Sequence, residues 1–277
     1  GVAQWMEAGG ERAYPDLVET YRRGILLVRV SETDAYVVDV FRVKGGSKHD
    51  WFLHGSADVD GTVSASVPTE HYGENLLSGV KVRFPEGERD RGDAEGRNLA
   101  YGYFQNVARG DVDEGVTLSF GLVDEAAGLR THLPGLSDSE IFLGDALSFR
   151  RANEDEALID QYRMPITLVR RTGEAPLESL FAAVHEPHGG DPFIKSANVR
   201  TGEDGGTVIE VNHGSTTDYI LLSDANGSVT LGEGELAGDV GFVRERKGKP
   251  VAMALWGGTR LRWSDTEVAS SGVQEAR

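Results

Sequence analysis

Short apolar stretches with a two-residue period constrain the fold of this chain more than any other feature. In residues 116–122, valine, leucine and phenylalanine alternate with threonine, serine and glycine, the pattern of a strand with one buried face. Residues 25–30 and 36–43 are two further stretches around a polar turn, as in a hairpin. Thirty-six glycines separate such stretches, and helical periodicity is nearly absent. We therefore predict an all-β fold, a large antiparallel β-sandwich of stacked sheets with very little helix.

Strand-like stretches continue along most of the chain, which favours one domain. We expect a single β-sandwich over residues 1–263, with a soft break near residues 150–163, where the sequence is acidic and irregular. Residues 264–277 are polar and predict a flexible C-terminal tail. Residues 86–97 contain no apolar residue larger than alanine, so they predict an exposed loop.

Charge and composition restrict the partners. A formal net charge of −17 argues against nucleic acid or an anionic membrane, because Lys and Arg bind both. The chain has no cysteine, which excludes disulfides and thiolate chemistry, and no apolar run approaches the roughly 18 residues of a membrane span. It begins at Gly1 without Met or a signal peptide, so we expect a processed or excised boundary. The compartment stays open, with an extracytoplasmic location favoured.

Two histidines enclose an aromatic stretch after a glycine turn. His49 and His54 are five residues apart, so in a regular strand they point to opposite faces, and a shared metal would need a bulge or bend. A histidine beside Asp50 also suits general acid–base chemistry. The alternative is structural, with His49 and Asp50 capping a strand end and His54 bonding to a neighbouring turn.

A second histidine-rich stretch places three potential ligands or proton carriers within four residues: His185, Glu186 and His188. Pro187 favours an extended backbone at Glu186 and is expected to interrupt regular strand pairing. The spacing differs from the helical HExxH zinc pattern. Two histidines and a carboxylate on a loop can bind a metal. The alternative is a polar loop at a strand end.

Basic residues gather near the N-terminus of this acidic chain: Arg22, Arg23, Arg29, Arg42, Lys44 and Lys48. Such a cluster can bind carboxylate or sulfate groups, which the planar guanidinium of Arg grips with two hydrogen bonds. Pairing with the surplus of Asp and Glu is the alternative. The tryptophans, with Tyr101 and Tyr103, could stack on sugars, although large aromatic side chains usually belong to the core.

On the stretch of residues 36–43, alternation puts Asp39 on one face and Arg42 on the other. A charge on each face predicts a sheet whose edge or end opens on a polar cleft.

Several of these stretches resemble the C-terminal β-region of heparinase II/III-like polysaccharide lyases. The resemblance begins with Tyr21-Arg22-Arg23 before an apolar strand and continues through residues 36–43, Gly45-Gly46, and His49-Asp50 to His54-Gly55. Residues 130–135 (RTHLPG) and 181–194 are similar to large bacterial members of the family. The resemblance covers most of residues 14–200.

The resemblance implies an N-terminal α/α toroid followed by stacked antiparallel β-sheets. It also implies β-elimination of acidic polysaccharides in the cleft between them, by a Tyr and a His, with an Asn or His neutralising the uronate carboxylate. A divalent metal would sit in the β-region of the full-length protein. The toroid and the segments with the catalytic His and metal ligands have no counterpart in this chain.

We therefore expect a β-module that is catalytically incomplete on its own, with an acidic polysaccharide and an upstream toroid of the same polypeptide as partners. The substrate-binding candidates are Arg22, Arg23, Arg42, Lys44, His49 and His54. The metal-ligand candidates are His185, Glu186 and His188. Two alternatives remain: a non-catalytic carbohydrate-binding or scaffolding β-sandwich, and a sugar-active enzyme that uses His185, Glu186 and His188.

Overall fold

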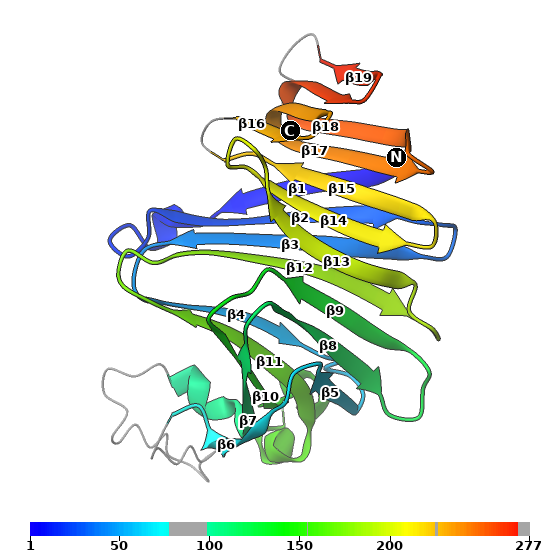
Figure 1. The fold of residues 1–277 in the computed structure, drawn as a ribbon. Helices are drawn as coiled ribbons and strands as arrows, with labels where there is room; N and C mark the ends of the chain where they lie inside the picture. Colours follow the sequence, from blue (N-terminus) through cyan, green and yellow to red (C-terminus); the bar gives the residue numbers. More distant parts are fainter. Residues whose placement is uncertain (78–98, 154, 225–226, 271–277) are drawn as a thin grey trace.

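A computed structural model describes residues 1–77, 99–153, 155–224 and 227–270 of the protein. Its described residues form three antiparallel sheets, which we call A, B and C (Figure 1). This confirms the predicted all-β fold of stacked sheets. The helical elements are short: the α-helix α1 (Phe149–Ala152) and the 3-10 helices η1 (Glu11–Ala13), η2 (Leu99–Tyr103) and η3 (Glu156–Gln161).

Sheet A runs in the order β1 (Ala3–Gly9), β2 (Thr20–Arg29), β3 (Ala35–Lys44), β12 (Glu178–His188), β9 (Gly128–Pro134), β8 (Gly115–Leu122) and β5 (Gly61–Ala65). Sheet B runs in the order β4 (Lys48–His54), β11 (Arg163–Thr172), β10 (Ser139–Leu147), β7 (Gln105–Val112) and β6 (Glu70–Asn75). Sheet C runs in the order β13 (Ile194–Thr201), β14 (Thr207–His213), β15 (Thr216–Leu222), β17 (Gly234–Arg246), β18 (Lys249–Trp263) and β19 (Thr266–Ala269), and β16 (Ser228–Leu231) also pairs with β17.

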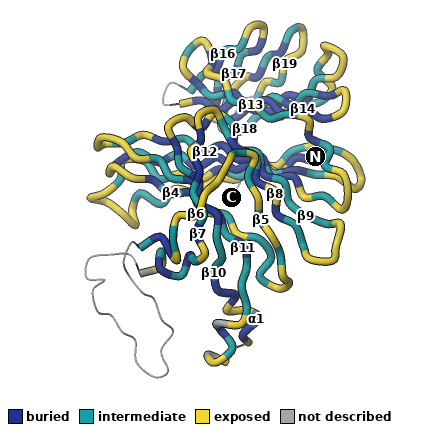
Figure 2. The backbone as a smooth tube through the Cα atoms, turned by 60° about the horizontal axis from the view of Figure 1, so that its bottom comes forward, coloured by how far each residue is buried: buried dark blue, intermediate teal, exposed yellow. Residues whose placement is uncertain are grey.

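Sheet A is the central layer. One of its faces packs on sheet C in a core that includes Val38 and Val40, and its other face packs on sheet B in a core that includes Phe41 and Phe181. Buried positions follow the strand centres and exposed ones the turns (Figure 2). The middle of β3 is therefore covered on both faces, so the charges of Asp39 and Arg42 do not mark a polar cleft at this point of the sheet. Asp39 and Arg42, the two charged residues in the middle of β3, are hydrogen-bonded to Arg23 and to the Ser223 carbonyl.

Sheet C also builds a small core of its own on the side away from sheet A, around Val243, Leu261 and Trp263. The pairing of β17 with β18 shifts in register next to Gly238. There the backbones of Gly238 and Gly258 approach so closely that a Cβ on Gly258 would lie 2.4 Å from the Cα of Gly238. Glycine is needed at this crossing because no side chain fits.

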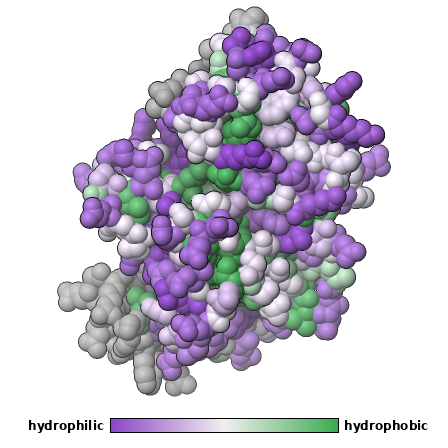
Figure 3. Space-filling view, in the orientation of Figure 1, coloured by the Kyte–Doolittle hydropathy of each residue, from purple (hydrophilic) through white to green (hydrophobic). Residues whose placement is uncertain are grey.

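On the face of the molecule seen in Figure 3, hydrophobic residues lie in patches between more numerous hydrophilic ones.

The chain boundaries differ in part from those expected. The stretch of residues 150–163 carries α1 and η3 and joins β10 to β11, which are neighbours in sheet B, so it is a connection within one sheet. Residues 266–269 of the expected tail form β19, paired with β18. Residues 271–277 and the loop expected at 86–97 lie outside the described residues. Within the described part of the chain, no helix is long and apolar enough to cross a membrane.

Candidate functional site

Two of the basic residues expected to bind substrate are ion-paired at the surface. Arg22 lies 3.4 Å from Glu7 and 3.1 Å from Glu11, and Lys44 lies 2.9 Å from Glu19. These side chains are partly or largely exposed, and such pairs contribute little to stability. The pairing alternative raised by the sequence therefore describes them better than a shared anion site.

Arg23 instead holds a buried carboxylate. Its Nε and Nη2 donate to the two oxygens of Asp39 at 2.8 and 2.5 Å. The indole N–H of Trp51 donates to the same carboxylate at 3.3 Å, and His185 Nε2 lies 3.7 Å from it. Burial alone would raise the pKa of Asp39, but interactions with His185 and Arg23 outweigh it and lower that pKa. Together, Arg23, Trp51 and His185 keep the Asp39 carboxylate ionised between sheets A and B.

Arg42 lies on the other face of β3, towards sheet C. Its Nη2 donates to the carbonyl of Ser223 at 3.3 Å, and burial lowers its pKa. Arg42 and Arg23 therefore belong to different interfaces of sheet A and do not form one basic surface.

His49 and His54 occupy opposite faces of β4, as their spacing predicts. His49 is buried, with Nδ1 2.9 Å from the hydroxyl of Ser179 and Nε2 2.5 Å from the carbonyl of Gly45. His54 is exposed, with Nδ1 2.8 Å from the carbonyl of Gly55. Both histidines therefore have structural contacts, but Asp50 pairs with Arg170 of β11 instead of capping a strand end. The six substrate-binding candidates do not converge on one place.

The three metal-ligand candidates lie on β12, a regular strand rather than a loop. His185 points towards sheet B, where Nδ1 lies 2.9 Å from the hydroxyl of Thr131 and the ring stacks on Trp51. The next residue, Glu186, points towards the opposite face. Consequently the structure does not bring His185, Glu186 and His188 together. Among the described residues, no group of three or more His, Asp or Glu side chains is arranged to hold a metal ion.

Glu186 is fully buried and fixes the passage from sheet A to sheet C. One carboxylate oxygen accepts hydrogen bonds from the main-chain N–H groups of Phe193 and Ile194, and the other accepts one from Arg130 Nε at 2.8 Å. His132 Nε2 lies 3.5 Å from the second oxygen. Burial would raise the pKa of Glu186, but His132, the Ile194 N–H and Arg130 together lower it. A carboxylate so fully engaged positions its neighbours and is a poor proton acceptor.

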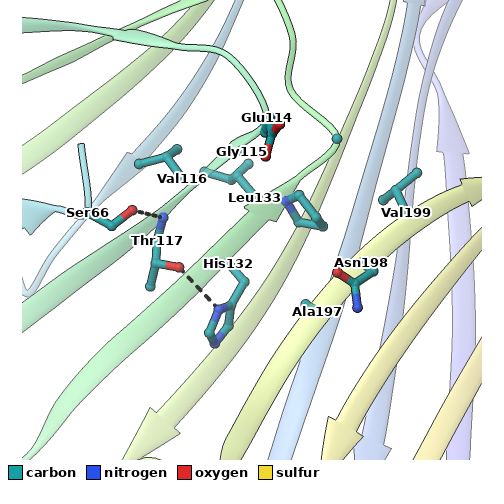
Figure 4. A pocket seen from close by; sticks show the side chains of 12 residues that line it. Ser66, Glu114, Gly115, Val116, Thr117, His132, Leu133, Ala197, Asn198 and Val199 are labelled. Atoms are coloured by element: carbon teal, nitrogen blue, oxygen red, sulfur yellow. Dashed lines mark hydrogen bonds between the residues drawn. The ribbon is translucent and has the colours of Figure 1, made fainter.

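His132 connects this buried group to a surface pocket between the β8–β9 hairpin and β13 (Figure 4). His132 Nδ1 lies 3.3 Å from the hydroxyl of Thr117, whose N–H donates to Ser66 Oγ at 2.9 Å. The pocket has a volume of about 340 Å³. Its hydrogen-bonding side chains are those of Ser66, Glu114, Thr117, His132 and Asn198.

The polar groups at the opening of this pocket have unused hydrogen-bonding capacity. Within the described structure, the Glu114 carboxylate and the Asn198 amide make no side-chain hydrogen bond or ion pair. Figure 4 shows Asn198 across the pocket from Thr117 and His132, with Glu114 at one end. The arrangement offers donors and acceptors to a small polar ligand, and we take it as the candidate site.

Sequence reasoning missed this site almost entirely. Only His132 was singled out, as part of residues 130–135, and for a family resemblance rather than a role. The other polar residues come from three segments far apart in the chain, and none of them carries a motif. A local pattern does not signal such a site, because pairing between distant strands creates it.

No protein-family model matches the chain, and no curated protein matches it.

Proposed function

We propose that the chain is a glycan-binding β-module of a heparinase II/III-like polysaccharide lyase, which holds the polysaccharide without cleaving it. The family assignment rests on the stretches at residues 21–55 and 130–135. Stacked antiparallel sheets are also the architecture that this resemblance implies. The binding role rests on one observation, the pocket whose Glu114 and Asn198 side chains have no partner among the described residues.

The chemistry of the pocket suits a sugar. Each sugar hydroxyl both donates and accepts a hydrogen bond, and the pocket offers hydroxyl, amide, imidazole and carboxylate groups. A volume of about 340 Å³ lies at the lower end of the range for small-molecule sites. No Lys or Arg is among the described residues that line it. Within an acidic polysaccharide, the pocket would therefore hold an uncharged, hydroxyl-rich unit rather than a uronate carboxylate.

Binding without turnover follows from the state of the candidate acids and bases. Glu186 accepts four hydrogen bonds or close contacts, and His185 lies on the opposite face of β12. General acid–base catalysis needs a proton carrier within reach of the substrate. We expect no unsaturated uronate product from heparin, chondroitin or alginate. A rise in the absorbance of that product, lost in His185→Ala or His188→Ala, would instead indicate an enzyme that uses β12.

Calorimetric titration of the chain with neutral and acidic oligosaccharides tests the binding role. Asn198→Ala and Thr117→Val should each weaken binding by about three- to tenfold, the loss of one hydrogen bond. Thr201→Ala, on the same strand as Asn198 but outside the pocket, is the matched control and should leave binding unchanged. Equal affinities for wild type and Asn198→Ala would exclude this pocket. The absence of any glycan binding would leave a scaffolding β-sandwich as the function.

A further inference from the structure

We propose that an uncovered face of sheet A and the free edge of β4 together form a docking site for one additional β-strand of a partner protein segment. We call this site the β4 ledge. Its floor consists of Met6, Ile25, Leu27 and Val37, and its wall is the unpaired edge of β4. The strand that fits it has apolar residues facing sheet A and carboxylates near its ends. This inference is independent of the sugar pocket.

The floor is apolar and open. Strand alternation points Leu26 and Val28 towards sheet C, where both are completely buried. Ile25 and Leu27 therefore face the side of sheet B, yet Leu27 is 45% exposed and Met6 on the neighbouring strand is 68% exposed. Towards the middle of the same face, Phe181 of β12 is completely buried beneath sheet B. Sheet B thus covers only part of this face and leaves Met6 of β1 and Leu27 of β2 exposed.

The relative placement of the two sheets puts the free edge of β4 beside this floor. Pro165 of β11 lies against Gly61 of β5, at the far edge of sheet A. The next strand of sheet B is β4, and its Trp51 reaches Asp39 on β3 and stacks on His185 of β12. Gly55, which is bonded to Pro165, lies against Phe120 of β8, so β4 crosses sheet A obliquely and lies nearer to β3 than β11 does. At the level of Trp51, one more strand beyond β4 would lie over β3 and β2, above Val37, Ile25 and Leu27.

The edge of β4 offers regular main-chain groups. Among the described residues, β4 pairs with β11 alone. The bonds from Gly55 N–H to the Pro165 carbonyl and from Gly173 N–H to the Ser47 carbonyl fix the hydrogen-bonding register at both ends of this pair. Since hydrogen-bonded and non-hydrogen-bonded residues alternate, the N–H groups of Asp50 and Phe52 point away from β11. Such an edge is a template for strand addition.

Charge indicates which strand fits. Arg23 and Arg29 flank the floor on the ledge face, and the side chain of Arg23 is 50% exposed. The acid on this face, Asp39, is 1% exposed and already bound to Arg23. Since Arg23 and Asp39 neutralise each other, the positive charge available to a ligand is that of Arg29, which makes no ion pair among the described residues, on a chain whose formal net charge is −17. Complementary potentials favour a strand with carboxylates at its ends and disfavour one with lysines there.

The test uses the full chain and two synthetic peptides of about nine residues, within the usual strand length. Both alternate Val with Thr; one ends in Glu at each side and the other in Lys. We expect the Glu peptide to bind about tenfold more tightly, less so as salt increases. On binding, hydrogen exchange at the amides of Asp50 and Phe52 should slow.

Two pairs of variants locate the site. Phe52→Pro removes one free-edge N–H and should weaken binding by about tenfold. Phe52→Ala loses the same ring but keeps the N–H, so it should bind within about twofold of wild type. If Phe52→Pro does not fold, Leu27→Asp places a repelling charge on an already exposed position and should weaken binding similarly, whereas Leu17→Asp, also exposed, should not.

Four outcomes would overturn the proposal. Equal binding of the two peptides would mean that charge does not select the added strand. Equal binding by Phe52→Pro and Phe52→Ala would mean that the edge of β4 takes no part in binding. Sedimentation of wild type as a dimer that Phe52→Pro dissociates would mean that a second copy covers the ledge. No binding at millimolar peptide would mean that the ledge is ordinary surface.

Discussion

Arg244 grips Asp218 with two hydrogen bonds of 2.7 Å, from Nε and Nη2 to the two carboxylate oxygens, at the interface of sheets A and C. Tyr36 of β3 donates its hydroxyl proton to the same carboxylate at 2.7 Å, and His213 Nε2 lies 3.0 Å from it. Arg244 also donates to the carbonyl of Arg29 on β2. All the ionic groups here are nearly inaccessible to water, so the two sheets are joined by a polar network as well as by apolar packing.

Asp218→Asn should lower the free energy of unfolding by about 3–5 kcal/mol, because it leaves the Arg244 charge buried without its counter-ion. Urea denaturation measures the change. Asp113→Asn, an exposed aspartate, is the control and should differ from wild type by about 0.5 kcal/mol or less. A loss below about 1 kcal/mol for Asp218→Asn would mean that the network contributes little to stability.

Acid should destabilise the protein through three buried carboxylates. In the folded state the pKa values of Asp39, Glu186 and Asp218 are lowered, because hydrogen bonds from Arg and His outweigh burial. A lowered folded-state pKa gives stability that is present above the unfolded-state pKa, about 4, and is lost as pH falls through the folded value. Urea midpoints measured from pH 7 downwards should be flat at first and then fall. The fall should be smaller in Asp218→Asn, and an equally steep fall would exclude Asp218 as a contributor.

The titration of Tyr101 should be observable at alkaline pH. Burial and a 2.5 Å hydrogen bond to Asp50 raise its pKa to about 12. A raised folded-state pKa stabilises the protein below the unfolded-state value, about 10, and this contribution is lost as pH rises through the folded value. Absorbance at the tyrosinate band, compared between wild type and Tyr101→Phe, should show a tyrosine that titrates near pH 12. In Asp50→Asn this titration should move to lower pH; an unchanged curve would contradict the role of Asp50.

Gly258→Ala should destabilise sheet C by about 1–3 kcal/mol or more, because the new methyl group meets main-chain atoms that cannot move aside. Its Cβ would lie 2.4 Å from the Gly238 Cα and 2.5 Å from the Ala237 carbonyl oxygen. Gly190→Ala has no atom within 4 Å of its Cβ and should leave the melting temperature nearly unchanged. Equal melting temperatures for the two variants would mean that the sheet relaxes at this crossing.

Local patterns predicted the strands well. The stretches at 36–43 and 116–122 lie within β3 and β8, because alternation is a local property that a half-buried strand requires. The order of the strands was beyond such reasoning: β12 pairs between β3 and β9. Alternation indicates that a face is buried but not which sheet buries it.

The same limit explains the errors at the candidate sites. His185, Glu186 and His188 are close in sequence, and Pro187 favoured a loop, yet Pro187 lies inside β12 opposite Leu129. Adjacent residues of a strand point to opposite faces of the sheet. His185 and Glu186 are neighbours in the sequence, so their side chains lie on opposite faces. For the basic cluster, the pairing alternative already considered from the acidic composition describes Arg22, Arg23 and Lys44.

The pairing of β3 with β12 also determines the order in which the protein is completed during synthesis. Residues 35–44 must wait for residues 178–188 to emerge from the ribosome before the central sheet closes. Until then the β1–β3 meander has an open edge and two apolar faces, and Asp39 lacks His185. Long-range pairing of this kind slows folding and exposes edges that aggregate. Truncation before β12 should therefore yield insoluble chains, whereas β13 to β19 follow in sequence and can add to a central sheet that already exists.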